Sequence, residues 1–155
     1  MKHIPGFGLI ALLAVAATVI GTALADDHRY TPPSKTVKAE CGSCHIAYPP
    51  QLLPARSWRA LMSGLDKHFG TDASLEPQTA AAITAFFEGN ASRETGSSAQ
   101  PVLRISETRW FVHEHDEVPG QVWKNPKVKS PSNCTACHRD AELGDFSEHR
   151  VSIPK

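Results

Sequence analysis

The sequence contains the five-residue pattern Cys-x-x-Cys-His twice, and the two copies use all four of its cysteines. Two thiols separated by two residues can both reach the vinyl groups along one edge of a porphyrin, and the histidine that follows can bind the iron. Each copy therefore predicts one covalently attached haem. The predicted attachment points are Cys41 and Cys44 for the first haem and Cys134 and Cys137 for the second, with His45 and His138 as the adjoining iron ligands.

Other uses of cysteine explain this pattern less well. A zinc site built from the four thiols gives no reason for a histidine directly after each pair. Disulfides within the pairs would close very short loops, which remove little entropy from the unfolded chain. A thioredoxin-like redox pair requires a strand followed by a helix, and neither copy has that context. Haem attachment is the interpretation that accounts for the whole pattern.

The N-terminus has the three-part layout of a secretory signal peptide. A basic start at Lys2 is followed by an apolar run over residues 7–20, and then by Ala23 and Ala25 in the A-x-A arrangement of a cleavage site. The apolar run is shorter than the roughly 20 residues that a spanning helix needs, which disfavours a retained anchor. We expect residues 1–25 to be removed and the mature protein to be periplasmic, without a membrane span.

The mature chain would be short and nearly neutral. Removal of 25 residues leaves 130 (155 − 25), enough for one ordinary domain or two very small lobes. Only Lys2 among the charged residues precedes the cleavage site, which leaves 15 basic residues (16 − 1) and 16 acidic ones. This balance lacks the basic footprint of a nucleic-acid-binding protein.

A small, polar stretch without hydrophobic periodicity lies between the two motifs and is typical of a linker. We place this linker at residues 93–101. It would separate a first haem lobe at residues 26–92 from a second haem lobe at residues 102–155.

The first lobe is predicted to be helical. Apolar residues recur at three- and four-residue spacing from an N-cap at Ser57 to Phe69, with Gly70 at the C-cap. A second helix is expected to begin near Pro77 and to end at Gly89. The side chains that this second helix should bury are Ile83, Phe86 and Phe87.

Prolines interrupt the remaining segments. Residues 48–54 contain three of them and are predicted to form an extended loop. Pro119, Pro126 and Pro131 break up the second lobe, where we expect loops and one or two helical turns around the haem. The predicted fold class is mainly α, with a helical first lobe and a second lobe that has little regular secondary structure.

The opposite axial position of each iron decides what the haem can do, because a closed position favours electron transfer and an open one permits gas or peroxide chemistry. For the first haem, His68 lies on the predicted apolar helix face, 23 residues after His45 (68 − 45). Met62 shares this face and is the rival ligand, although a flexible filler of the core is its simpler role. It is the only methionine after the cleavage site.

For the second haem the sequence leaves three candidates. His113 and His115 lie upstream of the second motif, and His149 follows His138 by eleven residues (149 − 138). The first two would point the same way in an extended chain and would diverge in a helix. The residues alone therefore do not separate His113 from His115.

Most of the mature chain resembles the small dihaem cytochrome c (DHC) family. The resemblance is carried by Glu40 through His45, Ala47-Tyr48-Pro49-Pro50, Leu52-Leu53-Pro54-Ala55, Trp58, Gly64-Leu65, His68-Phe69-Gly70 and Asp72-Ala73 in the first half, and by Trp110-Phe111, Glu114 through Pro119, Trp123, Ser130-Pro131, Asn133 through His138 and Gly144-Asp145-Phe146 in the second.

This resemblance implies two haems c with bis-histidine ligation, in which His68 matches the distal ligand of the first iron and His115 that of the second. It also implies a first lobe similar to class I cytochromes c. Members of the family are thought to pass electrons between a membrane-bound cytochrome b and a small, oxygen-binding monohaem cytochrome c.

The predicted function is single-electron transfer by a periplasmic protein that is not an enzyme. The alternative is a haem enzyme, of the peroxidase or nitrogen-oxide reductase type, or a gas-binding haem protein. Both alternatives require one open iron site. Glu114, His113 and Arg109 could furnish a distal pocket for such chemistry if His115 is not bound to the iron.

Overall fold

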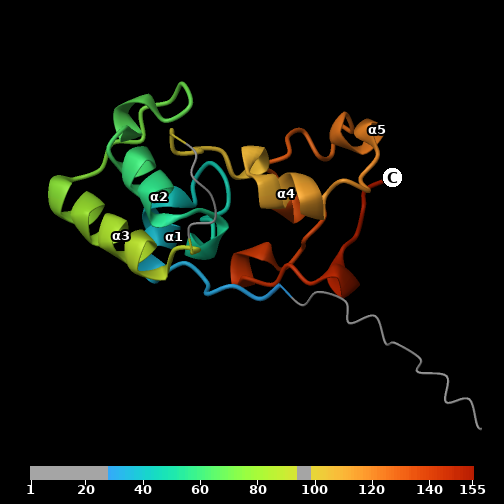
Figure 1. Ribbon diagram of the computed structural model, residues 1–155, viewed down its shortest axis with the longest axis horizontal. Helices are drawn as coiled ribbons and strands as arrows, with labels where there is room; N and C mark the ends of the chain where they lie inside the picture. The colour runs from blue at the N-terminus through green and yellow to red at the C-terminus, as the bar shows by residue number, and fades with distance from the viewer. Residues whose placement is uncertain (1–27, 94–98) are drawn as a thin grey trace, which may run out of the picture.

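The computed structural model describes residues 28–93 and 99–155. In these residues the first lobe contains helices α1 (Lys35–Cys41), α2 (Ala55–Met62) and α3 (Pro77–Asn90), and the second lobe contains α4 (Arg109–Glu114) and α5 (Gly120–Trp123) (Figure 1). The remainder of the described chain forms short 3-10 turns, loops and isolated β-bridges, with no sheet. The prediction of a mainly α fold with an irregular second lobe is confirmed.

The predicted signal peptide at residues 1–25 lies outside the described residues, as do positions 94–98 of the predicted linker. Within residues 28–93 and 99–155, no helix combines the length and the apolar character needed to cross a membrane.

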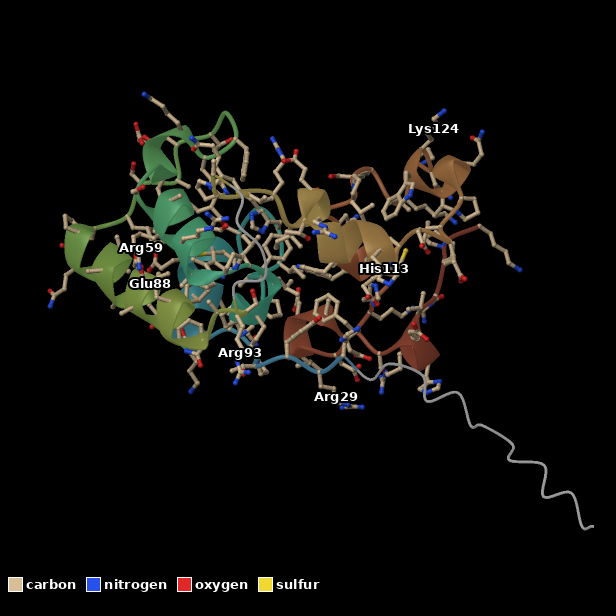
Figure 2. All side chains as sticks on the ribbon, in the orientation of Figure 1. Arg29, Arg59, Glu88, Arg93, His113 and Lys124 are labelled. Atoms are coloured by element: carbon tan, nitrogen blue, oxygen red, sulfur yellow. The ribbon has the colours of Figure 1, made fainter. Side chains whose placement is uncertain are left out.

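The first lobe is held together by α2 and α3, which meet through an aromatic pair. The rings of Trp58 and Phe87 stack with their centroids 4.0 Å apart. The indole N–H of Trp58 donates a hydrogen bond to the carbonyl of Pro50 (2.7 Å), which ties the loop after the first motif to α2. Arg59 and Glu88 point toward each other from the two helices (Figure 2), with Nε and Oε1 2.6 Å apart. The other buried members of this core are Val37, Ala47, Leu53 and Ile83.

Helix α3 agrees closely with its prediction. It begins at Pro77, whose fixed φ and missing N–H suit the first helical position, and the carboxylate of Glu76 accepts hydrogen bonds from the first turn. It ends at Asn90, one residue beyond Gly89, where the Asn90 amide donates to the carbonyl of Phe86 (2.8 Å). Of the side chains predicted to be buried, Ile83 and Phe87 are buried and Phe86 is half-buried.

Helix α2 begins two residues before Ser57, the predicted N-cap. Its first residue is Ala55, and Pro54 precedes it with an extended backbone. The carbonyl of Pro54 accepts hydrogen bonds from the N–H groups of Ser57 (2.9 Å) and Trp58 (3.2 Å). Ser57 is buried inside the helix, where it cannot act as a cap. The N-cap prediction for this serine is therefore wrong.

The same helix ends at Met62, well before the predicted end at Phe69. Gly64 has non-helical dihedral angles (φ −123°, ψ 29°), and a 3-10 turn follows over Leu65–Lys67. Glycine weakens a helix because it loses the most backbone freedom when it is fixed in one. His68 comes directly after the 3-10 turn, so it lies on a turn rather than on the helix face that the sequence predicted.

The proline-rich residues 48–54 contain a 3-10 turn at Pro50–Leu52, where the sequence predicted only extended chain. Leu52 and Leu53 are buried, and Leu53 belongs to the hydrophobic core of the first lobe. The indole N–H of Trp110, at the start of α4, donates to the carbonyl of Leu52 (3.3 Å). The stretch therefore contacts both lobes.

The N-terminal segment, residues 28–34, also joins the lobes, because it runs beside the C-terminal turns of the second lobe before it enters α1 (Figure 1). The N–H of Tyr30 donates to the carbonyl of Gly144 (2.8 Å), and the N–H of Phe146 donates to the carbonyl of His28 (2.9 Å). Residues assigned to the first lobe by the sequence thus hold the second lobe in place.

Gly144 makes this contact possible. Its φ is +78°, and a Cβ at this position would lie 2.3 Å from the carbonyl oxygen of Tyr30. We expect Gly144→Ala to lower the free energy of unfolding by about 1–3 kcal/mol, because both the left-handed backbone and the close approach favour glycine.

Gly89→Ala is the matched control. Gly89 lies near the end of α3, and a Cβ there would meet no atom within 4 Å. This variant should be unchanged or more stable by about 0.5–1 kcal/mol. Urea unfolding of both holoproteins measures the two effects, and wild-type stability of Gly144→Ala would contradict the expectation.

Candidate haem sites

The first Cys-x-x-Cys-His motif begins at the C-terminal end of α1. The helix starts at a Ser34 cap and ends at Cys41. The N–H of Gly42 then donates to the carbonyl of Lys38 (3.1 Å), and a Cβ at Gly42 would lie 2.4 Å from that oxygen. Glycine therefore lets the motif turn tightly away from the helix. The turn leaves Cys44 exposed and Cys41 half-buried.

His45 and His68 face each other at this first site. Their ring centroids are 6.2 Å apart, and their planes are inclined by 33°. Metal–imidazole bonds are about 2 Å long, which, with the distance from each nitrogen to its ring centre, places two imidazoles on opposite sides of one metal at a centroid separation of about 6 Å. The two rings are therefore spaced as a pair of axial ligands would be.

Met62, the rival of His68, packs against the hydrophobic core of the first lobe. It is the last residue of α2, whereas His68 lies beyond the 3-10 turn that follows. This placement supports the role of core filler for the methionine.

The second motif forms a 3-10 turn at Cys134–Ala136, and the N–H of His138 donates to the carbonyl of Cys134 (2.8 Å). It opens onto a largely apolar cavity. The lining includes Phe111, Trp123, Val128, Cys137, His138 and Phe146. Aromatic and aliphatic side chains of this kind are suited to the faces of a porphyrin.

His115 and His138 face each other across this second site, with ring centroids 6.1 Å apart and planes inclined by 75°. Thr108 caps α4 by accepting a hydrogen bond from the N–H of Phe111 (3.3 Å), and His115 follows the last residue of that helix. Phe111 stacks on the ring of His115 with a centroid distance of 4.0 Å. The helix thereby fixes the histidine against the cavity.

The other two candidates do not face His138. Because residues 109–114 are helical, His113 and His115 diverge, and the side chain of His113 is 80% exposed with Nδ1 3.9 Å from Asp116. His149 lies in an exposed 3-10 turn.

Hydrogen bonds orient one histidine of each facing pair. Nδ1 of His45 lies 2.7 Å from the carbonyl oxygen of Ile46, and Nδ1 of His115 lies 2.8 Å from that of Phe111. An N–H donated from Nδ1 leaves the lone pair on Nε2, as metal binding requires. Their counterparts His68 and His138 each bury Nδ1 without a hydrogen-bond partner.

The surroundings of these two counterparts favour neutral imidazole. Burial lowers the pKa of His138, and the proximity of His115 lowers it further, although Asp145 opposes this shift. Burial likewise lowers the pKa of His68, and His45 and Arg104 lower it further. A neutral imidazole can donate its lone pair to a metal, whereas a protonated one cannot.

Some residues at the sites were not predicted. Tyr48, assigned only to a loop, stacks on His45 with a centroid distance of 4.8 Å. The guanidinium of Arg104, from the second lobe, lies 4.1 Å from the ring centroid of Phe69, the residue that follows His68. The position of Tyr48 three residues after the first motif was the available signal, whereas nothing in the local sequence links Arg104 to Phe69.

The residues at each site fit a haem. Each site has two thiols at the required spacing and two imidazoles about 6 Å apart, and the second adds an apolar cavity. The described residues contain no cluster of three or more histidine, cysteine or acidic side chains suited to a bare metal ion.

Comparison with known proteins agrees with this chemistry. A dihaem cytochrome c from Shewanella baltica OS155 is 43% identical, with a TM-score of 0.70 over 80% of this chain and 95% of that one. Two structures of dihaem cytochrome c from Rhodobacter sphaeroides are 43% and 46% identical, with TM-scores of 0.66 and 0.64, and each comparison covers 73% of this chain and 96% of the other. No curated protein matches.

The family model for dihaem cytochrome c, DHC, matches residues 37–146. That range contains both Cys-x-x-Cys-His motifs, so the prediction of two haems is confirmed. The matches also confirm the resemblance noted in the sequence. The chain belongs to the dihaem cytochrome c family, which implies a role in electron transfer.

Proposed function

We propose that the protein is a periplasmic electron carrier in which two histidines bind each haem iron. His45 and His68 would serve the first iron, and His138 and His115 the second. The observation that supports this most directly is the spacing of the two imidazole pairs, at 6.2 and 6.1 Å. With a histidine on each side, neither iron would keep a position for a substrate or a gas.

Each haem, when bound, supplies a one-electron couple between ferric and ferrous iron. The cysteines would hold the porphyrin, and the carbonyls of Ile46 and Phe111 orient one imidazole of each pair. Methionine as an axial ligand raises the potential of a cytochrome c relative to histidine. We therefore expect both midpoint potentials to lie below those of cytochromes with histidine and methionine ligands.

Aromatic side chains surround the imidazole pair of the second site. Phe111 stacks on His115, Trp123 lies 5.9 Å from the same ring, and Phe146 lies 5.3 Å from His138. Oriented ligands among apolar side chains suit electron transfer, because little has to rearrange when the charge changes.

The competing function, a haem enzyme or a gas-binding protein, would need one of these histidines to be off the iron. Neither Glu114 nor His113 then has a clear catalytic position. His113 is largely exposed, and Glu114, although it lines the cavity, is engaged with His28, 3.4 Å away. We therefore propose electron transfer without catalysis.

His115→Ala tests the second pair. We expect the variant to convert one of the two haems to high spin and to make that haem bind carbon monoxide, because it opens one axial position. Absorption spectra of the ferric and ferrous forms measure this. His113→Ala is the matched control and should leave both haems low spin. If His113→Ala made one haem high spin and His115→Ala did not, His113 would be the ligand of the second iron in place of His115.

His68→Ala tests the first pair in the same way. It should open the other haem alone, while Met62→Leu preserves the apolar volume and should keep both haems low spin. Loss of low-spin character in Met62→Leu, with none in His68→Ala, would make the methionine the ligand.

We further propose that the protein relays electrons between a membrane-bound cytochrome b and a small, oxygen-binding monohaem cytochrome c. Membership of the dihaem cytochrome c family supports a role as a redox carrier, and residues 1–25 support the periplasmic location. The partner surface would include Lys124, Lys127 and Lys129, which are exposed beside the second site. Lys124 projects from the second lobe (Figure 2).

Reversing two of these charges tests the surface. With an acidic monohaem cytochrome c, we expect Lys124→Glu with Lys127→Glu to slow bimolecular electron transfer on the order of tenfold at low salt. The difference should shrink as salt shortens the range of the charges. Lys35→Glu, at the exposed start of α1, is the control and should react at the wild-type rate. Equal rates for both variants in stopped-flow measurements would remove these lysines from the partner surface.

A further inference from the structure

Tyr48 contacts both haem sites. It lies three residues after His45, and its ring stacks on the imidazole with a centroid distance of 4.8 Å and an interplanar angle of 23°. Its hydroxyl donates a hydrogen bond to the carbonyl oxygen of Ser132 (2.7 Å), 84 residues further along the chain. One side chain of the first lobe thus reaches the segment that carries the second motif.

The oxygen that accepts this hydrogen bond also lies beside the second haem attachment point. Sγ of Cys134 is 3.8 Å from the same Ser132 carbonyl oxygen. Cys134 is the first thioether position of the second haem. A continuous series of contacts therefore runs from the His45 ring through the Tyr48 ring and hydroxyl, and through the Ser132 carbonyl, to the Cys134 sulfur.

The segment that receives Tyr48 is held in a defined shape. The hydroxyls of Ser130 and Ser132 are 2.8 Å apart, and the N–H of Ser132 donates to the hydroxyl of Ser130 (3.2 Å). The N–H of Asn133 donates to the carbonyl of Ser130 (3.0 Å). These local bonds direct the Ser132 carbonyl toward Tyr48, so the contact between the lobes does not depend on a loose loop.

We propose that Tyr48 is the positioning residue that couples the two haems, and that electrons pass between the haem sites along this series of contacts. In each transfer, one haem iron goes from ferrous to ferric and the other from ferric to ferrous. No bond forms or breaks and no proton moves. This inference rests on the proposed function as an electron carrier and adds a route within the molecule.

The tyrosine acts as a bridge and is not itself oxidised. The proposed role needs only the stacking of its ring on His45 and the hydrogen bond to Ser132, and it requires no change in the protonation of the phenol.

Tyr48→Phe tests the inference on the holoprotein, because it keeps a ring against His45 and removes the hydroxyl. The rate of electron exchange between the haems is measured by rapid photoreduction of a fraction of the protein, followed by spectral monitoring of the redistribution. We expect this rate to fall severalfold, while the haem count and the low-spin spectra stay unchanged. Tyr48→Leu, which also removes the ring, should slow exchange further and shift the midpoint potential of the first haem.

Trp110→Phe is the matched control. It removes another hydrogen bond between the lobes, from the indole to the carbonyl of Leu52 (3.3 Å), and the described structure shows no ring contact between Trp110 and His45. Each variant loses one hydrogen bond between the lobes, so both should have a slightly lower thermal stability. Trp110→Phe should nevertheless leave the exchange rate at the wild-type value. An equal loss of rate in Trp110→Phe would mean that any loosening of the lobes slows exchange.

A wild-type exchange rate in Tyr48→Phe, with both haems low spin, would overturn the inference and leave the carrier function intact. The carrier function would fail in a different way, because the wild-type protein would then show a high-spin haem or bind carbon monoxide.

Discussion

The need to fill the space between two facing imidazoles governs this structure. Among the described residues of the second lobe, the buried apolar side chains are Phe111, Val128 and Ala141, too few for a core of their own. Its helices are single turns or little longer. A haem in the cavity would supply the missing apolar volume, so we expect the second lobe to depend on its cofactor for folding. The first lobe, with the Trp58–Phe87 stack, has more protein core and longer helices.

Contacts between the lobes then make the two sites one unit. The N-terminal segment pairs with residues 144–146, Trp110 reaches the carbonyl of Leu52, and Tyr48 reaches the carbonyl of Ser132. These bonds come from three separate parts of the chain. The relative placement of the haem sites is therefore set by the protein and not by a single connecting stretch, which is what transfer of electrons between the sites requires.

The chemistry of the sites could be predicted from the sequence because it is encoded in local spacing. The two motifs specify two haems, and Pro77 specifies the start of α3. The sequence did not reveal that α2 ends at Met62, because the apolar spacing continues past Gly64. The helical backbone, however, stops before that glycine. The choice between His113 and His115 depended on whether residues 109–114 are helical. Contacts between distant residues, such as Tyr48 with Ser132, leave no mark in a single sequence.

The central claim is that protein ligands close both irons. The most direct test is to record absorption spectra of the purified protein, oxidised and dithionite-reduced, with and without carbon monoxide, together with a haem count from the pyridine haemochrome. We expect two haems per chain, low-spin bands in both states and no change on addition of carbon monoxide. A high-spin ferric band, or a carbon monoxide shift in one of the two haems, would contradict it and would indicate an open site for gas binding or catalysis.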